Sequence, residues 1–582
     1  MPVVKVLIPA SPHIRAYDGH FRATRFVACA RGRGSVGSGD VTSPTPPQAF
    51  VVPPALGWLL AVPALLGALI TLVLPTAQTI WLSFQSGGVL RESTYVGMAN
   101  YGKLLGDSGF WQALGFTLSL TVIPLLVAVV VGPLLALALD RAGTWPRRAG
   151  RIALSLAVVV FSPVAVAGAW LRGLMPNASG LATLAEGLTE PGTAPGTMRL
   201  IVAAGTFGVV CALAVIAFLP ALRGGTPGPA TLVVGVLVAL AVVAVGLQTF
   251  SLGLVLTKGG PQRATETLAG LQYDFAFRQA QFGPGASVAA LTGVILGVLG
   301  IVATVVAVTA RLRITLTPRT PSPMPDGTSS APAPAPGRVA ASVGALVVVI
   351  AIALVLAWPW MDGVLASPPS TPAGSFTTQL TTWAPAITGA VVSVGVAYLA
   401  ALGIGGLRPL GRASEWLLLP FAPWLFVGAG PLTVANWQNV HNLGLIDSFP
   451  ALIPPLLVSV PALLVLTLLC KGLAERADGD FFGGVFLPSL PMAGILAGAV
   501  TLVNAHDLLW PLLVIQKPGM FTAPVAQVQQ LSGYDGTAPD LGAATPLVVV
   551  AVALAALVAA QLLYLDRLAI QTNRSHARTS AA

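Results

Sequence analysis

Long apolar stretches dominate this chain and constrain its fold more than any other feature. About twelve of them are long enough to cross a bilayer, and they form two sets of six around a Pro/Ala-rich segment. A hydrocarbon core about 30 Å thick needs roughly 20 apolar residues of helix, and a water-soluble fold has no way to bury so many continuous apolar runs. The sequence therefore predicts an all-α polytopic membrane protein made of two six-helix halves, an organisation typical of transporters.

The apolar stretches also set the expected domain boundaries. The predicted spans are 55–74, 111–139, 152–174, 200–219, 230–255 and 286–310 in the first half, then 339–358, 383–402, 416–434, 449–469, 492–515 and 544–565 in the second. The expected divisions are a disordered basic tail over 1–50, a first half over 51–313, a linker over 314–338, a second half over 339–570 and a C-terminal tail over 571–582. The linker is rich in Pro and Ala, a composition typical of an extended tether.

Charge predicts the orientation of these spans. Only 9% of the residues are charged and 55% are hydrophobic, whereas soluble domains carry roughly 25% charged residues. The net charge of +10 therefore indicates membrane orientation and not nucleic-acid binding. With the N-terminus in the cytoplasm, about 16 of the lysines and arginines beyond residue 50 fall in inner loops and the C-terminal tail and 6 to 8 outside. This excess fits the positive-inside rule and predicts a multi-pass protein with both termini cytoplasmic and the lipid bilayer as a partner.

A glycine-rich turn follows the fifth predicted span on the outer side. Gly259, Gly260 and Pro261 lead through Thr265 to the run Tyr-Asp-Phe-Ala-Phe at 273–277. Gly-Gly-Pro is typical of a tight turn, because glycine reaches positive φ freely and proline fixes the residue that follows. The tract resembles the loop before the last helix of carbohydrate-type ABC importer permeases, in the subunit class that includes the maltose system's larger permease. The segments 95–101 and 109–111 resemble that family's loop before the second helix.

The second half resembles the partner permease subunit of the same maltose- or glycerol-phosphate-like systems. Gly444 and Asp447 lie in Leu-Gly-Leu-Ile-Asp-Ser, and Asp507 and Trp510 lie in Asp-Leu-Leu-Trp-Pro-Leu-Leu. The family usually has Trp-Asn before that aspartate, where this chain has Ala-His. Together the matches cover most of 51–570, so the chain resembles a natural fusion of two permease subunits.

The resemblance implies an importer for a sugar or related small polar solute in a bacterial plasma membrane. It implies two partners, a pair of ABC ATPase subunits and an extracellular or periplasmic solute-binding protein. The chain has no Gly-x-x-x-x-Gly-Lys-[Ser/Thr] motif to bind phosphates. We therefore expect no enzyme activity, cofactor or metal in this chain, with ATP bound by the partner subunits.

The loops expected to contact the ATPase depart from the family pattern. The family carries Glu-Ala-Ala, Asp-Gly-Ala and Leu-Pro between its fourth and fifth core helices, where a short helix docks on the ATPase. The second half retains part of this pattern, at Glu475, Asp478, Gly479, Phe486 and Pro488, but has Leu473 at the leading glutamate. The first half has only a Gly/Pro-rich stretch at 220–229, whose composition disfavours a docking helix.

Polar residues inside the spans leave alternatives open. His506, Asp507 and Trp510 are candidates for a translocation path, since ionisable groups at membrane depth are often functional; the alternative places them at the outer mouth, solvated or paired. Gln248 and Gln561 are expected to form hydrogen bonds across helices. Two other functions remain open. One is a scaffold or sensor derived from permeases, favoured by the first-half loop. The other is a secondary transporter, which would need more ionisable groups within the spans.

Overall fold

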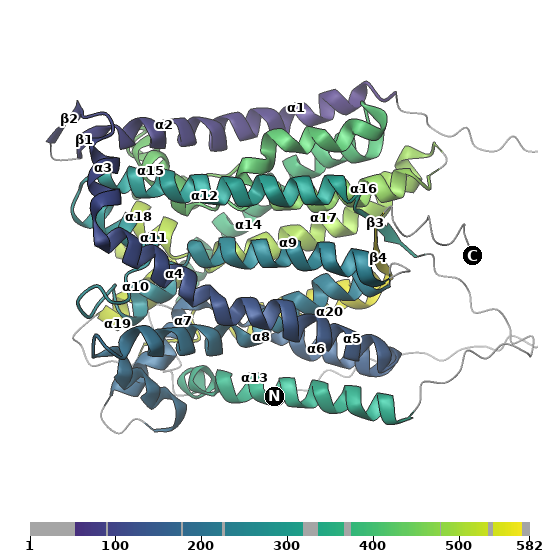
Figure 1. Cartoon of the computed structure of the whole chain (residues 1–582), viewed down its shortest axis with the longest axis horizontal. Coiled ribbons are helices and arrows are strands. Elements are labelled where there is room, and N and C mark those ends of the chain that lie inside the picture. Colours follow the sequence, from purple (N-terminus) through teal and green to yellow (C-terminus); the bar gives the residue numbers. More distant parts are fainter. Residues whose placement is uncertain are drawn as a thin grey trace, which may run out of the picture. The chain divides into compact units, whose positions relative to one another are not determined.

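A computed structural model of the chain describes residues 53–88, 91–175, 179–223, 227–317, 336–365, 374–477, 479–532 and 539–572. The predicted N-terminal tail (1–50) lies outside these residues, as do all but the first two residues of the predicted C-terminal tail (571–582) and most of the predicted linker. Figure 1 shows the described elements as a layered bundle of long helices with two ends. We name these ends by the small sheets that they carry. The hairpin end holds strands β1 and β2, and the ladder end holds strands β3 and β4.

The described residues of the first half form twelve α-helices together with short π- and 3-10-helical segments. In chain order its elements are α1 (Leu56–Ala68), η1 (Leu69–Val73), α2 (Leu74–Ser83), β1 (Gln85–Gly88), β2 (Arg91–Tyr95), α3 (Ala99–Gly106), α4 (Ser108–Leu126), η2 (Val127–Val131), α5 (Gly132–Arg141), α6 (Thr144–Val159), α7 (Pro163–Leu171), η3 (Arg172–Leu174), η4 (Gly180–Leu188), α8 (Ala194–Leu222), α9 (Pro227–Leu247), α10 (Ser251–Leu256), α11 (Leu268–Tyr273), η5 (Asp274–Arg278), α12 (Phe282–Thr309) and β3 (Arg313–Leu316).

In the second half, the residues that the structure describes form eight α-helices and more irregular backbone. Its elements are α13 (Pro336–Leu365), α14 (Phe376–Ala401), η7 (Leu402–Leu407), η8 (Gly411–Trp424), η9 (Gly430–Leu432), α15 (Thr433–Asn442), η10 (Phe449–Leu452), α16 (Val460–Ala474), η11 (Phe482–Phe486), α17 (Leu487–Ala505), α18 (Leu509–Val514), η12 (Pro518–Met520), α19 (Ala523–Ser532), α20 (Leu547–Leu563), η13 (Leu565–Arg567) and β4 (Leu568–Gln571).

The chain is an all-α polytopic membrane protein, as predicted. Among the described residues, nine helices are long and apolar enough to cross a membrane. A tenth span is formed if α6 and the segment Pro163–Leu174, which meet at a bend of 78°, count as one. Helix α16 is apolar but shorter. The predicted number of twelve regular spans is therefore not confirmed.

Proline explains why two predicted spans differ from regular helices. The predicted span 416–434 is a 3-10 helix, η8, that contains Pro420 and Pro423 and ends before a bend. The predicted span 449–469 begins with the short η10 and becomes helical only at α16, where Pro461 occupies the first turn. Proline lacks the N–H that an α-helix interior requires, but it is tolerated in the first helical turn.

The two halves exchange their first helices. Helix α1 packs against α14 and η7 of the second half, and α13 packs against α5, α7 and α8 of the first half. The exchange continues deeper in the bundle, because α12 packs on η8 while α20 packs on α6. Close contact between α1 and η7 depends on two glycines, since a Cβ on Gly403 would lie 2.4 Å from the Gly57 carbonyl oxygen. One buried apolar cluster accordingly draws on both halves, since it includes Ala64 and Leu72 of the first half and Val394 and Leu466 of the second.

The chain segments that leave the last helix of each half pair with one another at the ladder end. Strands β3 and β4 are antiparallel, with Thr315 opposite Ala569 and Leu316 opposite Leu568. Strand β3 lies within the segment predicted to be a linker, so the first residues of that segment are ordered; 318–335 lie outside the described residues. The described turns between α5 and α6, η7 and η8, and α16 and η11 also lie at this end (Figure 1). All were predicted to be cytoplasmic.

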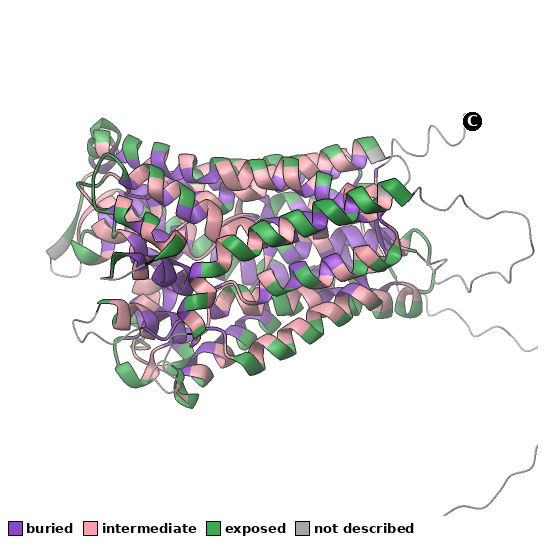
Figure 2. Ribbon diagram, turned by 90° about the horizontal axis from the view of Figure 1, so that it is seen from below, coloured by how far each residue is buried: buried purple, intermediate pink, exposed green. Residues whose placement is uncertain are grey.

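Apolar residues cover the outside of the bundle as well as its core. Figure 2 shows buried residues facing inward and exposed residues along the outer sides of the helices. The outer residues include many large apolar side chains, among them Leu134, Val245 and Val548, which are more than half exposed. A water-soluble protein rarely exposes so large an apolar surface. The exposed surface therefore fits contact with lipid.

Candidate functional site

The segment after α16 is the second-half region predicted to contact an ATPase. Helix α16 ends at Ala474 and η11 begins at Phe482. The described residues between them form successive turns, with backbone hydrogen bonds from Arg476 to Leu473 and from Asp480 to Ala477. The short docking helix that the resemblance implied is therefore not formed by these residues; Asp478 lies outside the described residues. Gly479 has a φ of +91°, and no atom lies within 4 Å of the position of a Cβ there.

Two ion pairs fix the start of this segment, at Glu475. The Glu475 carboxylate lies 2.8 Å from Arg313 of β3 and 3.3 Å from Arg408, which follows η7. Because Arg313 belongs to the first half and Arg408 to the second, Glu475 joins the two halves at the ladder end. This predicted coupling residue thus has a structural role that its motif did not indicate.

The other predicted coupling residues, Phe486 and Pro488, lie where η11 passes into α17. Their carbonyl oxygens accept hydrogen bonds from the hydroxyls of Tyr398, at 2.9 Å, and Tyr564, at 2.6 Å. Both tyrosines belong to the second half, so these bonds join the start of α17 to α14 and to the residue that follows α20. The structure thus places Glu475, Gly479, Phe486 and Pro488 along one continuous segment.

A buried ion pair lies just behind that segment. The Lys471 ammonium lies 2.7 Å from the Glu415 carboxylate, and both side chains are under 10% exposed. Lys471 also donates to the Leu312 carbonyl oxygen at 3.1 Å, which brings the first half into the same contact. Sequence reasoning missed this pair. The sequence feature that could have indicated it is a pair of opposite charges at the edges of two successive predicted spans, Glu415 just before 416–434 and Lys471 just after 449–469.

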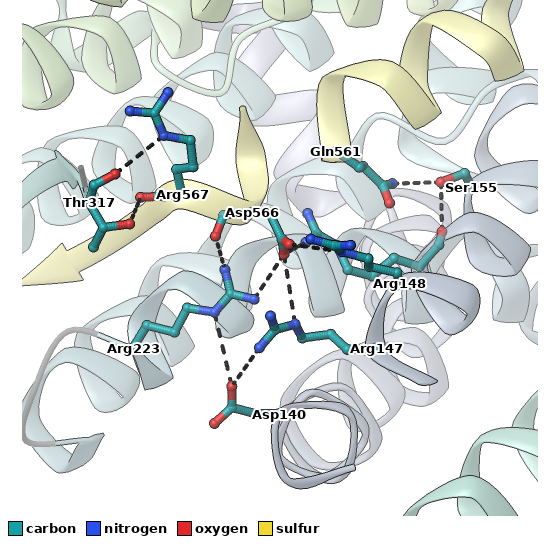
Figure 3. A network of polar contacts seen from close by, with 10 residues as sticks. Asp140, Arg147, Arg148, Ser155, Arg223, Thr317, Gln561, Asp566 and Arg567 are labelled. Atoms are coloured by element: carbon teal, nitrogen blue, oxygen red, sulfur yellow. Dashed lines mark hydrogen bonds and ion pairs between the residues drawn. The ribbon is translucent and has the colours of Figure 1, made fainter. Parts of the chain in front are cut away.

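The corresponding part of the first half has almost no loop. Helix α8 ends at Leu222 and α9 begins at Pro227, which leaves four residues between them, and 224–226 lie outside the described residues. In place of a docking element, the ladder end of this half carries a cluster of arginines around Asp566 (Figure 3). We call Asp140, Arg147, Arg148, Arg151, Arg223 and Asp566 the arginine cluster.

The arginine cluster spans both halves. Asp566 of η13 lies 2.6 Å from Arg151, 3.1 Å from Arg223, 3.7 Å from Arg148 and 3.8 Å from Arg147. Asp140 of α5 lies 3.7 Å from Arg147 and 4.0 Å from Arg223. The Asp566 carbonyl oxygen also accepts from Arg223, at 2.5 Å. Sequence reasoning missed Asp566. The sequence feature that could have indicated it is an acidic residue directly after the last predicted span.

At the hairpin end, the glycine-rich turn folds back on itself. The Thr265 hydroxyl donates to the Gly260 carbonyl oxygen and to the Thr257 hydroxyl. Gly259 has a φ of +84°, and a Cβ there would lie 2.4 Å from the Glu266 carboxylate. The structure thus brings together Gly259, Gly260, Pro261 and Thr265, as the motif predicted.

Sequence reasoning did not single out Glu266, which lies under this turn and is 9% exposed. Burial raises the pKa of Glu266 to about 7, opposed in part by Arg263. Glu266 also lines a small cavity with Lys258, Tyr273 and Asp274. At about 20 Å³, this cavity has room for about one water molecule. It is far too small to hold a sugar.

The second outer motif joins two loops. Asp447 has a φ of +60°, and its carboxylate accepts hydrogen bonds from the backbone N–H groups of Gln516 and Lys517. These donors lower the pKa of Asp447. Gly444, three residues earlier, has a φ of +67° and allows the chain to turn after α15. The motif therefore positions the loop after α18.

The three residues predicted to line a translocation path lie where α17 meets α18. The Asp507 carboxylate accepts from the backbone N–H groups of Leu509 and Trp510, at 3.2 and 3.4 Å. Trp510 is buried and donates to the Ala451 carbonyl oxygen at 2.8 Å. His506 is also buried, edge-on to Trp383, and neither ring nitrogen has a hydrogen-bond partner among the described residues. Asp507 and Trp510 are thus held by hydrogen bonds to the backbone, whereas His506 is held by packing.

Two glutamines form hydrogen bonds across helices, as predicted, and these bonds also join the two halves. Gln248 of α9 donates to the Phe426 carbonyl oxygen at 2.8 Å and accepts from the Gly428 N–H at 2.8 Å. Gln561 of α20 donates to the Ser155 hydroxyl of α6 at 2.6 Å. Both bonds satisfy polar groups that lipid could not satisfy. They support a structural role for these side chains.

Part of the chain is similar to known sugar permeases. It is 30% identical over 88 residues to the trehalose transport system permease protein SugA of Mycobacterium tuberculosis strains CDC 1551 and H37Rv, which is 15% of this chain and 29% of SugA. It is 30% identical over 84 residues to the probable starch degradation products transport system permease protein AmyD of Thermoanaerobacterium thermosulfurigenes, 14% of this chain and 29% of AmyD. No protein-family model matches the chain.

These matches are partial, because the chain spans about 29% of the length of the curated relatives that it matches. Over that stretch they support the resemblance to carbohydrate-type ABC permeases that the motifs indicated. They also agree with the multi-pass helical structure.

Proposed function

We propose that this chain is the fused transmembrane component of an ABC importer for a sugar or related small polar solute. The observation that carries the proposal is the exchange of α1 and α13 between two halves, each of which resembles one permease subunit. The partial similarity to SugA and AmyD supports the solute class. In this proposal the ladder end is cytoplasmic and the hairpin end receives the solute-binding protein.

Transport in this proposal proceeds by alternating access. ATPase subunits on separate chains bind below the Gly479 turn, and their closure moves α17 through the contacts of Phe486 and Pro488. The halves then rock about the contacts that join them. The β3–β4 ladder and the ion pairs of Glu475 join the two halves at the ladder end, and in this proposal they rearrange when the solute leaves on that side. The solute must bind the two states with different affinity for this cycle to run in one direction.

Reconstitution tests the proposal. The full chain would be placed in proteoliposomes with the ATPase encoded in the same genome and its solute-binding protein, and uptake of labelled trehalose and starch-derived oligosaccharides measured. We expect a complex with two ATPase subunits and uptake that requires ATP. A chain that binds no ATPase and supports no uptake across this panel would contradict the proposal.

One observation favours a second function. The first half joins α8 to α9 by only four residues, which leaves no room for a docking helix on that side. A scaffold or sensor derived from permeases would need no such helix. The same reconstitution separates the two functions, because a scaffold would bind its partner proteins without ATP-dependent uptake.

A further inference from the structure

Positive charge exceeds negative charge in the arginine cluster. Its four arginines face only two carboxylates, those of Asp140 and Asp566, among the charged side chains described there. Three of the arginines are poorly exposed, with Arg151 at 5%, Arg223 at 16% and Arg147 at 17%. Partly buried charge is costly when it is not balanced. The cluster therefore favours a bound anion.

Hydrogen bonding within the cluster is also incomplete. The Nε atoms of Arg147 and Arg151 are buried and have no hydrogen-bond partner within the described part of the chain, and Arg151 as a whole is only 5% exposed. Each guanidinium offers five N–H donors, more than two carboxylates can accept. Arg148 differs from the other three, since its side chain is 55% exposed. Arg148 is thus the point at which an anion can reach the cluster from outside.

The outer face of α6 indicates the source of that anion. Trp145, Arg148, Ile152 and Leu156 follow one another at helical spacing, so they lie on one face of the helix. Trp145 is 78% exposed and Leu156 is 43% exposed. Along α6, away from the ladder end, this face runs from tryptophan and arginine to aliphatic side chains. A phospholipid lying along this face would place its headgroup beside the arginine and its acyl chains beside the aliphatic side chains. Tryptophan, at the headgroup end, is typical of the membrane interface.

We propose that the arginine cluster and the outer face of α6 bind one anionic phospholipid, with the phosphate at Arg148 and an acyl chain along Ile152 and Leu156. A free phosphate ion would match the arginines but gain nothing from the apolar face. The second half offers a contrast, since Arg412 at the start of η8 is exposed and has no carboxylate within ion-pair distance among the described residues. A site of this kind is independent of whether the chain transports a solute.

Lipid titration of the purified full chain tests this site. Binding of fluorescent phosphatidylglycerol would be measured in detergent micelles, with phosphatidylcholine as the neutral lipid. Since each basic residue near an anionic surface contributes about fivefold in affinity, Arg148→Gln should weaken phosphatidylglycerol binding about fivefold. Arg148→Lys should retain most of the affinity. Arg412→Gln is the matched control, because it removes the same charge at the same end without touching the cluster.

Two further measurements, on a Trp145 variant and on displacement by phosphate, complete the test. Trp145→Ala removes an exposed side chain outside the ion pairs, and it should also weaken binding if Arg148→Gln proves unstable. Equal binding of phosphatidylglycerol by the wild type, Arg148→Gln and Trp145→Ala would overturn the proposal. So would an equal loss in Arg412→Gln, which would indicate a general effect of charge. Displacement of the lipid by inorganic phosphate alone, with no effect of Trp145→Ala, would assign the cluster to a soluble anion and also overturn it.

Discussion

The Asp566 carboxylate lies 2.6 Å from Nη1 of Arg151, and this contact joins the last helical segment of the second half to α6 of the first. Both side chains are under 10% exposed. A second cross-half contact lies at the same end, where Lys471 of α16 donates to the Leu312 carbonyl oxygen beyond α12. Each half thus uses a cation to hold the chain segment that leaves the last helix of the other.

Loss of the Asp566 charge should destabilise the protein strongly. Asp566→Asn leaves four arginines with only Asp140 nearby, and removing one partner of a buried pair costs about 3–5 kcal/mol. The measurement is thermal unfolding of the full chain in detergent. Asp362→Asn is the control, because Asp362 is 63% exposed and pairs with Arg172 at 3.5 Å, a contact worth at most about 1 kcal/mol. Equal shifts in the two variants would contradict the structural role of Asp566.

Glu266 should make stability depend on pH. Burial raises its pKa in the folded protein to about 7 from 4.5, so the folded state holds the proton more tightly than the unfolded state. Its contribution to stability is therefore complete below about pH 4.5 and is lost as the pH rises through about 7, with a total on the order of 3 kcal/mol. Glu266→Gln should remove this part of the pH dependence.

The control for Glu266 is Glu190→Gln, which changes an exposed glutamate and should leave the pH profile as it is in the wild type. Both variants would be compared by thermal unfolding between pH 5 and pH 8.5. A Glu266→Gln protein whose stability still falls by the same amount across this range would show that another group is responsible.

The all-α polytopic class could be predicted from sequence because lipid imposes a simple rule on length and polarity. The predicted spans differ from the structure where proline interrupts an apolar stretch, as at Pro420 and Pro423 in η8. At the hairpin end, Thr265 bonds within its own turn and Asp447 bonds one neighbouring loop. Contacts such as Asp566 with Arg151 join residues 415 positions apart. No local pattern marks such a pair, and β3 was hidden in a segment whose composition indicated a tether.

Gly479 should be sensitive to substitution for a functional reason and not for reasons of stability. Its φ of +91° lies in a region that only glycine adopts readily, and the space around it is open. Gly143, between α5 and α6, has a φ of +93° and equally open surroundings, so Gly143→Val is a matched control. We expect similar, small losses of stability from both changes. Only Gly479→Val should separate ATP hydrolysis from uptake in the reconstituted system, and unchanged uptake in that variant would refute the coupling role.

The β3–β4 ladder should act as a gate. Thr315 and Ala569 are opposite one another in the ladder and both are buried. Opposed residues of antiparallel strands have Cα atoms about 4.5–5.5 Å apart, within the range of disulfides. After replacement of the three native cysteines, Thr315→Cys with Ala569→Cys should form a bond that holds the ladder end closed. Uptake should stop on oxidation and return on reduction, whereas either single variant should respond to neither treatment. Full uptake with the bond formed would mean that the ladder stays paired while the solute passes.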